Sequence, residues 1–238
     1  MKVLNPAVTI LVTSHMKPYL RGLLESIVTQ TRRDFEAVVL DSGRWISRDD
    51  EAAKEMAAIH ADYSGHPLIW WTTTGERPGL PERACPSPWA VNAAIAAGVV
   101  RGRYMCIVSD DDAYRPGFVE KMAGYLDAHE PVQAVWCGMD IHRVRDGSRE
   151  YAYSIPATDT RGAGGFDCRV DGMQVMYRTS LLDRIASPYL DENPALETCR
   201  HADGLWLERV AAAAGEVHHV PEVLCDHQMT PLSTYSPS

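Results

Sequence analysis

The first half of the chain alternates between short apolar runs and longer segments of helical character, and this alternation constrains the fold more than any other feature. The apolar runs cover residues 8–12, 35–40, 68–73 and 103–108, and they are rich in the β-branched and aromatic side chains of buried strands. The segments between them, 17–30, 49–63 and 88–101, have the length and composition of helices. Strands that alternate with helices predict an α/β fold with a Rossmann-like, mostly parallel central sheet flanked by helices.

The second half of the chain is less regular. We expect helices at 116–129, 179–185 and 203–214, and strands at 132–137 and 173–177. Residues 140–144 and 150–154 are expected to pair as a hairpin, and 217–227 to form a last pair of strands broken at Pro221. These strands predict a smaller C-terminal sheet. Because no linker composition divides the chain, we expect residues 1–238 to form a single domain.

The composition excludes some classes of function. The chain has 238 residues, of which 45% are hydrophobic, and a formal net charge of -9, whereas a nucleic-acid surface needs a basic footprint. The six cysteines are dispersed and include no Cys-x-x-Cys pair, which argues against a zinc site and for reduced thiols. No leader pattern or apolar segment of membrane-spanning length is present. We therefore expect a cytoplasmic protein without an integral membrane segment.

The run Ser109, Asp110, Asp111 and Asp112 directly follows the fourth predicted strand. Adjacent carboxylates repel one another, so all three stay ionised cheaply only near a cation. Mg²⁺ and Mn²⁺ prefer oxygen ligands and often share them with the phosphates of a substrate. The competing interpretation is a solvated acidic turn, because Asp is common in turns.

Polar residues also follow the first two strands, at Ser14 and at Asp41. Ligands of doubly wound sheets bind beyond the carboxyl ends of the strands. We therefore expect these residues to converge with the acidic run on one edge of the sheet.

Four segments, in order, resemble the family 2 glycosyltransferases, which have the GT-A fold. They comprise 8–15 with 19–31, then 34–43, then Asn92 with 102–116, and finally 202–224. The resemblance runs from about residue 8 to 233. It implies that one sugar passes from a nucleotide-diphosphate donor to a hydroxyl acceptor with inversion, in a transferase of the hexosyl or N-acetylhexosaminyl type. It also implies a nucleotide-sugar-binding half at 1–112 and an acceptor and catalytic half at 113–238.

The resemblance assigns the donor nucleotide to the ends of the first two strands. It places Thr13, Ser14 and His15 in the loop that cradles the nucleotide, and Asp41 on the base. Many members have a second acid where this chain has Ser42. By the resemblance, an aspartate at the position of Asp41 usually contacts uracil, so we expect a UDP-sugar donor, and Ser42 leaves GDP- and dTDP-sugars as alternatives.

The acidic run corresponds to the DXD motif of the family, with Ser109 in place of its first acid. By resemblance, Asp111 is the main ligand of Mn²⁺ or Mg²⁺, Asp110 contacts the ribose, and Asp112 assists. His227 is a candidate third ligand, since related enzymes sometimes place one near the end of the last strand. The alternative for His227 is a packing histidine.

The matching position for the general base is Asp203, where the family has a Glu-Asp pair and this chain has Ala202 before the aspartate. The alternative is that Asp203 only caps the helix that follows it. Asp191 and Glu197 are the other candidates for the base.

Three further residues are candidates for the site. Arg83 is a candidate contact of the diphosphate, because Arg suits phosphate oxygens, and the alternative is a solvated loop charge. Asn92 is assigned to the nucleotide. Asp171 lies where relatives line the acceptor site, although it could merely cap a turn.

Two other functions compete with an inverting glycosyltransferase. A metal-dependent nucleotidyltransferase would have a glycine-rich phosphate loop after the first strand, whereas residues 13–17 contain no glycine. A non-catalytic nucleotide-sugar-binding protein would explain the missing acids at Ser42, Ser109 and Ala202. The acceptor is expected to be a small molecule or a saccharide.

Overall fold

The computed structural model describes residues 5–14, 19–41, 50–73, 87–145, 148–157, 170–186 and 202–229. Strands and helices alternate through the first half of the chain, as the sequence predicts. In chain order the elements are β1 (Val8–Thr13), α1 (Leu20–Val28), β2 (Phe35–Asp41), α2 (Asp50–Tyr63), β3 (Ile69–Thr73), α3 (Ser87–Ala96), β4 (Tyr104–Ser109), β5 (Asp112–Tyr114), α4 (Phe118–Ala128), β6 (Ala134–Arg145), β7 (Ser148–Ile155), the 3₁₀ helix η1 (Gly172–Gln174), β8 (Val175–Arg178), the 3₁₀ helix η2 (Thr179–Arg184), α6 (Ala202–Ala214) and β9 (Val217–Met229).

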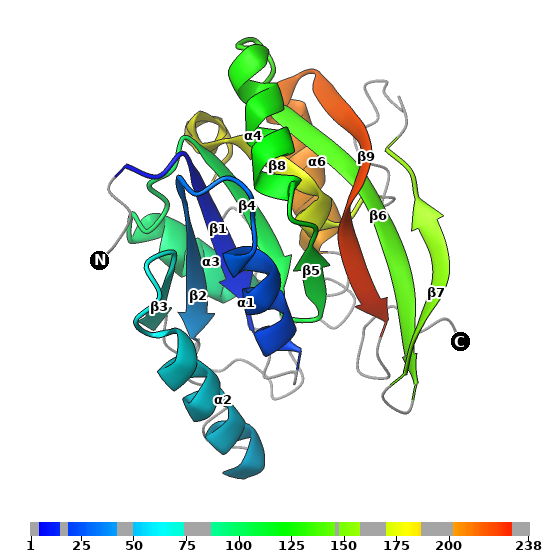
Figure 1. The fold of residues 1–238 in the computed structure, drawn as a ribbon. Helices are drawn as coiled ribbons and strands as arrows, with labels where there is room; N and C mark the ends of the chain where they lie inside the picture. Colours follow the sequence, from blue (N-terminus) through cyan, green and yellow to red (C-terminus); the bar gives the residue numbers. More distant parts are fainter. Residues whose placement is uncertain are drawn as a thin grey trace.

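One mixed sheet of nine strands runs through the described part of the chain (Figure 1). Its order is β3-β2-β1-β4-β8-β6-β9-β5, and β7 also pairs with β6. The pairs β1–β2, β2–β3, β1–β4 and β6–β9 are parallel, while β5, β7 and β8 run antiparallel to their neighbours. The predicted α/β fold class is confirmed, and the C-terminal strands join the central sheet.

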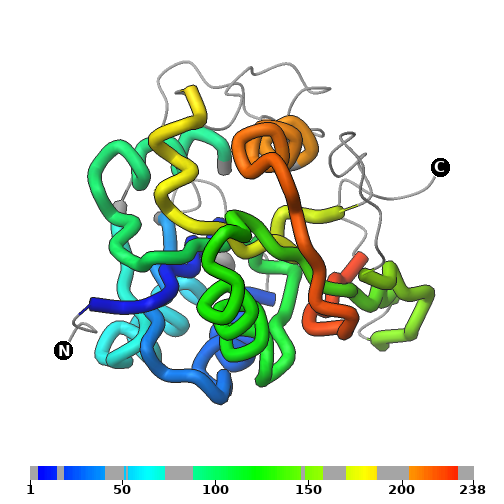
Figure 2. Tube along the Cα trace, turned by 90° about the horizontal axis from the view of Figure 1, so that it is seen from above, coloured from blue at the N-terminus to red at the C-terminus, as the bar shows by residue number. Residues whose placement is uncertain are grey.

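Two layers of helices cover the sheet, one on each face. Figure 2 shows α4 and α6 on opposite sides of it. One hydrophobic core lies between the sheet and the helices α1, α2 and α4, and a second lies between the sheet and α3 and α6. The strand β1 is buried along its whole length because both cores pack against it, which explains its continuous β-branched and apolar sequence.

The chain departs from the sequence prediction mainly in the C-terminal strands. The predicted strands at 132–137 and 140–144 form one strand, β6. The predicted strand pair at 217–227 is wrong, since β9 runs unbroken through Pro221. Val220 pairs with Cys137 and Val223 with Gly138, so Pro221 lies in a bulge. A bulge tolerates proline because a bulged residue need not donate to the ladder.

A buried ionic network anchors the amino ends of the parallel strands. The Glu36 carboxylate of β2, 1% exposed, accepts hydrogen bonds from the Thr9 hydroxyl at 3.0 Å and the Trp70 indole at 3.0 Å, and pairs with the Arg101 guanidinium. The Thr9 oxygen in turn accepts the backbone N–H of Gly102 at 2.9 Å. A buried carboxylate is tolerable when paired and hydrogen-bonded in this way.

Gly102 lies so close to β1 that a side chain would not fit, and this gives a first prediction. A Cβ there would approach the backbone nitrogen of Thr9 to 2.6 Å. We expect Gly102→Ala to lower the free energy of unfolding by about 1–3 kcal/mol in urea titrations, because the backbone must move. The matched control is Gly124→Ala in α4, where nothing lies within 4 Å. It should raise stability by about 0.5–1 kcal/mol. Equal effects of the two substitutions would contradict the packing argument.

Candidate active site

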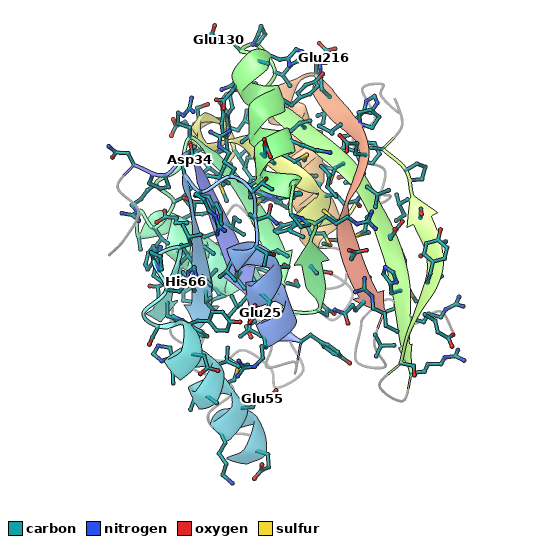
Figure 3. All side chains as sticks on the ribbon, in the orientation of Figure 1. Glu25, Asp34, Glu55, His66, Glu130 and Glu216 are labelled. Carbon is teal, nitrogen blue, oxygen red and sulfur yellow. The ribbon has the colours of Figure 1, made fainter. Side chains whose placement is uncertain are left out.

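The carboxyl ends of the parallel strands meet at one edge of the sheet, as expected. Thr13 pairs in register with Leu40 and with Ser109, and Asp41 pairs with Thr73. The opposite edge lies near the end of α4 and the start of β9, where Figure 3 labels Glu130 and Glu216. The acidic run therefore lies on the carboxyl-end side, away from the Glu36 network.

The acidic run is buried, which contradicts the alternative of a solvated turn. Asp110 and Asp111 form the turn between β4 and β5, and Asp112 begins β5. Their exposed fractions are 0%, 4% and 3%. Burying three adjacent carboxylates is costly unless donors or cations lie close to them.

Side chains at and just after the end of β1 support the run. The Ser14 hydroxyl donates to the Asp110 carboxylate at 3.0 Å. The hydroxyls of Thr13 and Ser109 lie 3.3 Å apart, and Thr13 also donates to the carbonyl of Val108 at 3.3 Å. Ser109 thus joins β4 to β1.

Asp112 and His227 form a buried pair across two antiparallel strands. They lie opposite each other in the β5–β9 register, and His227 Nδ1 is 2.6 Å from Asp112 Oδ1. The other Asp112 oxygen accepts the backbone N–H of Ser109 at 3.3 Å. The backbone N–H of Gln228 donates to the carbonyl of Asp111 at 3.1 Å. β9 therefore holds the acidic run through both backbone and side chain.

Burial and neighbouring charges perturb both members of this pair. Burial raises the pKa of Asp112 to about 7, although His227 opposes that shift. Burial lowers the pKa of His227, but the charge and hydrogen bond of Asp112, with Asp171 and Asp111, outweigh burial and raise it to about 9. A protonated His227 therefore offsets part of the negative charge of the acidic run.

The side chains of Asp111, Asp112 and His227 fit a divalent cation. One ligand atom of each lies within 4.8 Å of the others, and all three residues are buried. Carboxylate oxygens suit Mg²⁺ and Mn²⁺, and an imidazole is a common ligand of transition metals. The predicted ligand residues are thus brought together, and the excess of carboxylates gives the site the charge that a cation requires.

A second cluster of potential metal ligands is already paired with arginine side chains. One potential ligand atom each of Asp140, His142 and Asp226 lies within 4.8 Å of the other two. Arg115 bonds to both carboxylates, at 2.5 Å to Asp140 and 3.1 Å to Asp226, and Arg149 lies 3.3 Å from Asp226. The two guanidinium groups balance the two carboxylates, which makes this cluster an ionic network.

Side chains of α1 and its C-terminal end fix the segment that follows the acidic run. The Ser26 hydroxyl accepts the backbone N–H of Tyr114 at 3.1 Å. The buried amide of Gln30 donates to the carbonyl of Arg115 at 2.9 Å and accepts the N–H of Val119 at 3.0 Å. No local sequence pattern predicts this role of Gln30, because its hydrogen-bond partners lie 85 and 89 positions away.

The other predicted residues are placed as follows. Asn92 is buried in α3. Asp171 caps η1, where its carboxylate accepts the N–H of Met173 at 3.1 Å, and its charge acts on His227. Asp41 ends β2, and Asp203 lies in the first turn of α6, which begins at Ala202. The remaining candidates lie outside the described residues: His15, Arg83, Asp191 and Glu197.

No protein-family model matches the chain. Among curated proteins, it is 25% identical over 208 residues to protein CgeD of Bacillus subtilis (strain 168), which covers 85% of this chain and 46% of that protein. The chain thus spans about half the length of this relative.

Solved structures of S. aureus TarS share the fold. TarS 1–349 in complex with UDP-GlcNAc superposes with a TM-score of 0.66 at 16% identity, over 97% of this chain and 61% of that one. TarS 1–349 in complex with UDP gives a TM-score of 0.59 at 17% identity, over 94% and 61%. Within the described residues, no helix has both the length and the apolar character needed to cross a membrane.

The Asp112–His227 pair generates a prediction about pH. Without metal, NMR of the His227 ring should show titration near pH 9, and in Asp112→Asn the midpoint should fall by several units because burial then dominates. Since the folded pKa of His227 is raised, the stability that protonation of His227 contributes should be full below about pH 6.5 and lost as pH rises through 9. His227→Gln assigns the resonance. An unchanged midpoint in Asp112→Asn would refute the pairing.

Proposed function

We propose that this protein is a metal-dependent, inverting glycosyltransferase that moves a sugar from a UDP-sugar to a hydroxyl acceptor. The observation that carries the proposal is the buried group of Asp110, Asp111, Asp112 and His227 at the carboxyl ends of the parallel strands. Ligands of such sheets bind at this edge. The sequence resemblance to family 2 glycosyltransferases points to the same residues.

The choice of donor has two supports. The fold is shared with TarS, which was solved in complex with UDP-GlcNAc and with UDP. In this chain, Asp41 ends β2 at the same edge as the acidic run, where the resemblance assigns it to the base. Ser14 orients the carboxylate of Asp110 for a ribose hydroxyl. GDP- and dTDP-sugars are the alternative donors.

The proposed metal ligands are Asp111, Asp112 and His227. Bound there, Mn²⁺ or Mg²⁺ would act as a Lewis acid for the leaving diphosphate. The burial of the three ligands excludes water from the charges that bind the diphosphate, and electrostatic interactions are stronger in such an environment.

The general base proposed for the acceptor hydroxyl is Asp203. It lies in the first turn of α6, and a helix N-terminus stabilises a carboxylate. Proton removal by a positioned base is worth roughly two to four powers of ten in rate. Asp171 would bind the acceptor, because the sequence resemblance assigns this position to the acceptor site. The acceptor is proposed to be a small molecule or a saccharide.

A thermal-shift titration tests the donor site. UDP at 100 times its Kd, with Mn²⁺, should stabilise the protein by about 2.7 kcal/mol, which corresponds to a rise in Tm of roughly 5–10 °C. Omission of Mn²⁺ or the substitution Asp111→Asn should remove most of the shift. Asp183→Asn, which changes an exposed aspartate of η2, is the matched control and should retain it.

Transfer is tested by the release of UDP from UDP-sugars with an acceptor panel, compared between wild type and Asp203→Asn. A loss of at least a hundredfold in kcat with donor binding unchanged supports the general base. Binding without sugar transfer by the wild type would favour a non-catalytic binding protein. No shift with any nucleotide would overturn the donor site.

A further inference from the structure

Arg115 connects the two segments that carry the proposed metal ligands. It directly follows β5, three residues after Asp112. Its guanidinium contacts the Asp226 carboxylate of β9 through Nη2 at 3.1 Å and Nε at 3.4 Å. Asp226 immediately precedes His227. The same guanidinium therefore binds β9 one residue away from the imidazole.

Further contacts make Arg115 a junction of four segments. Nη2 bonds to the Asp140 carboxylate of β6 at 2.5 Å, and Nη1 to the carbonyl of Val223 at 3.3 Å. Its backbone N–H donates to the carbonyl of Leu224 at 2.9 Å, and its carbonyl accepts from Gln30. Charge-assisted bonds of this kind are stronger than neutral ones and fix geometry.

The guanidinium lies on the opposite face of the sheet to the side chains of Asp112 and His227. Asp112 and His227 are paired in the β5–β9 register, and Ala113 with Asp226 form the next pair. Since side chains alternate along a strand, Asp226 and Arg115 point away from the face that carries His227. In the part of the chain that the structure describes, the contacts of the Arg115 guanidinium are with Asp140, Val223 and Asp226, so the backbone of β5 and β9 links it to Asp112 and His227.

We propose that Arg115 is a positioning residue of the metal site, which sets the distance between the acidic run and His227 by joining β5 to β9 and β6. This inference rests on the proposed function, because it concerns the same site. Residues that orient metal ligands without touching the metal typically change metal affinity by roughly 10- to 100-fold.

The chain offers a matched control for this idea. Arg149 of β7 also pairs with Asp226, at 3.3 Å, and is similarly exposed, at 42% against 38% for Arg115. It lies on β7, outside the acidic segment. Arg149→Gln therefore removes the same charge from the same carboxylate without releasing β5.

The experiment measures Mn²⁺ affinity of the purified chain by electron paramagnetic resonance of free Mn²⁺, with urea unfolding of each variant. Arg115→Gln should weaken Mn²⁺ binding at least tenfold, and Arg149→Gln less than twofold. Arg115→Lys keeps the charge but not the several hydrogen bonds of the planar guanidinium, and should give an intermediate loss of Mn²⁺ affinity. The double variant Arg115→Gln with Asp226→Asn should bind Mn²⁺ at least as tightly as whichever single variant has the lower Mn²⁺ affinity.

The outcomes separate this inference from the proposed function. If the wild type binds no Mn²⁺, the proposed metal site fails. If the wild type binds Mn²⁺, and Arg115→Gln and Arg149→Gln both bind it as tightly as the wild type, the positioning role is refuted and the metal site stands. If Arg115→Gln does not fold, Arg115→Lys decides, and unchanged affinity in that variant overturns the inference.

Discussion

The electrostatic cost of burying three adjacent carboxylates is the constraint on which the carboxyl-end half of this structure depends. Asp110, Asp111 and Asp112 would repel one another and lose hydration if nothing compensated them. The compensation comes from β1 through Ser14 and from β9 through His227 and a backbone amide. The contacts that join β5 to β9 at this point are therefore also those that compensate the charge of the acidic run.

The two ends of the sheet divide stability and chemistry between them. At the amino ends, the carboxylate of Glu36 accepts a hydrogen bond from Thr9 and forms an ion pair with Arg101. Its negative charge is therefore balanced within the scaffold. At the carboxyl ends, the acidic run has an excess of negative charge even with His227 protonated. A closed network suits a scaffold, whereas an excess of charge suits a site that binds a ligand.

The elements whose sequence pattern is local could be predicted, and those that depend on a distant partner could not. β1, β2 and β4 are mostly apolar because both faces are covered, and the acidic run was found by its position after β4. β5 has only three residues, Asp112–Tyr114, and forms because β9 lies opposite. The pairing of Asp112 with His227 spans 115 positions, and no local pattern specifies it. The roles given to Asp41 and Asp203 stay predictions.

The bulge at Pro221 determines which side of the sheet each later residue of β9 faces. Between the pairs Cys137–Val220 and Met139–Cys225, β9 has four intervening residues and β6 has one. The surplus is odd, so the alternation of side chains is inverted beyond the bulge. Without the surplus, Asp226 would take the face now held by His227. The length of this strand can therefore change only in steps of two if the imidazole is to stay beside the acidic run.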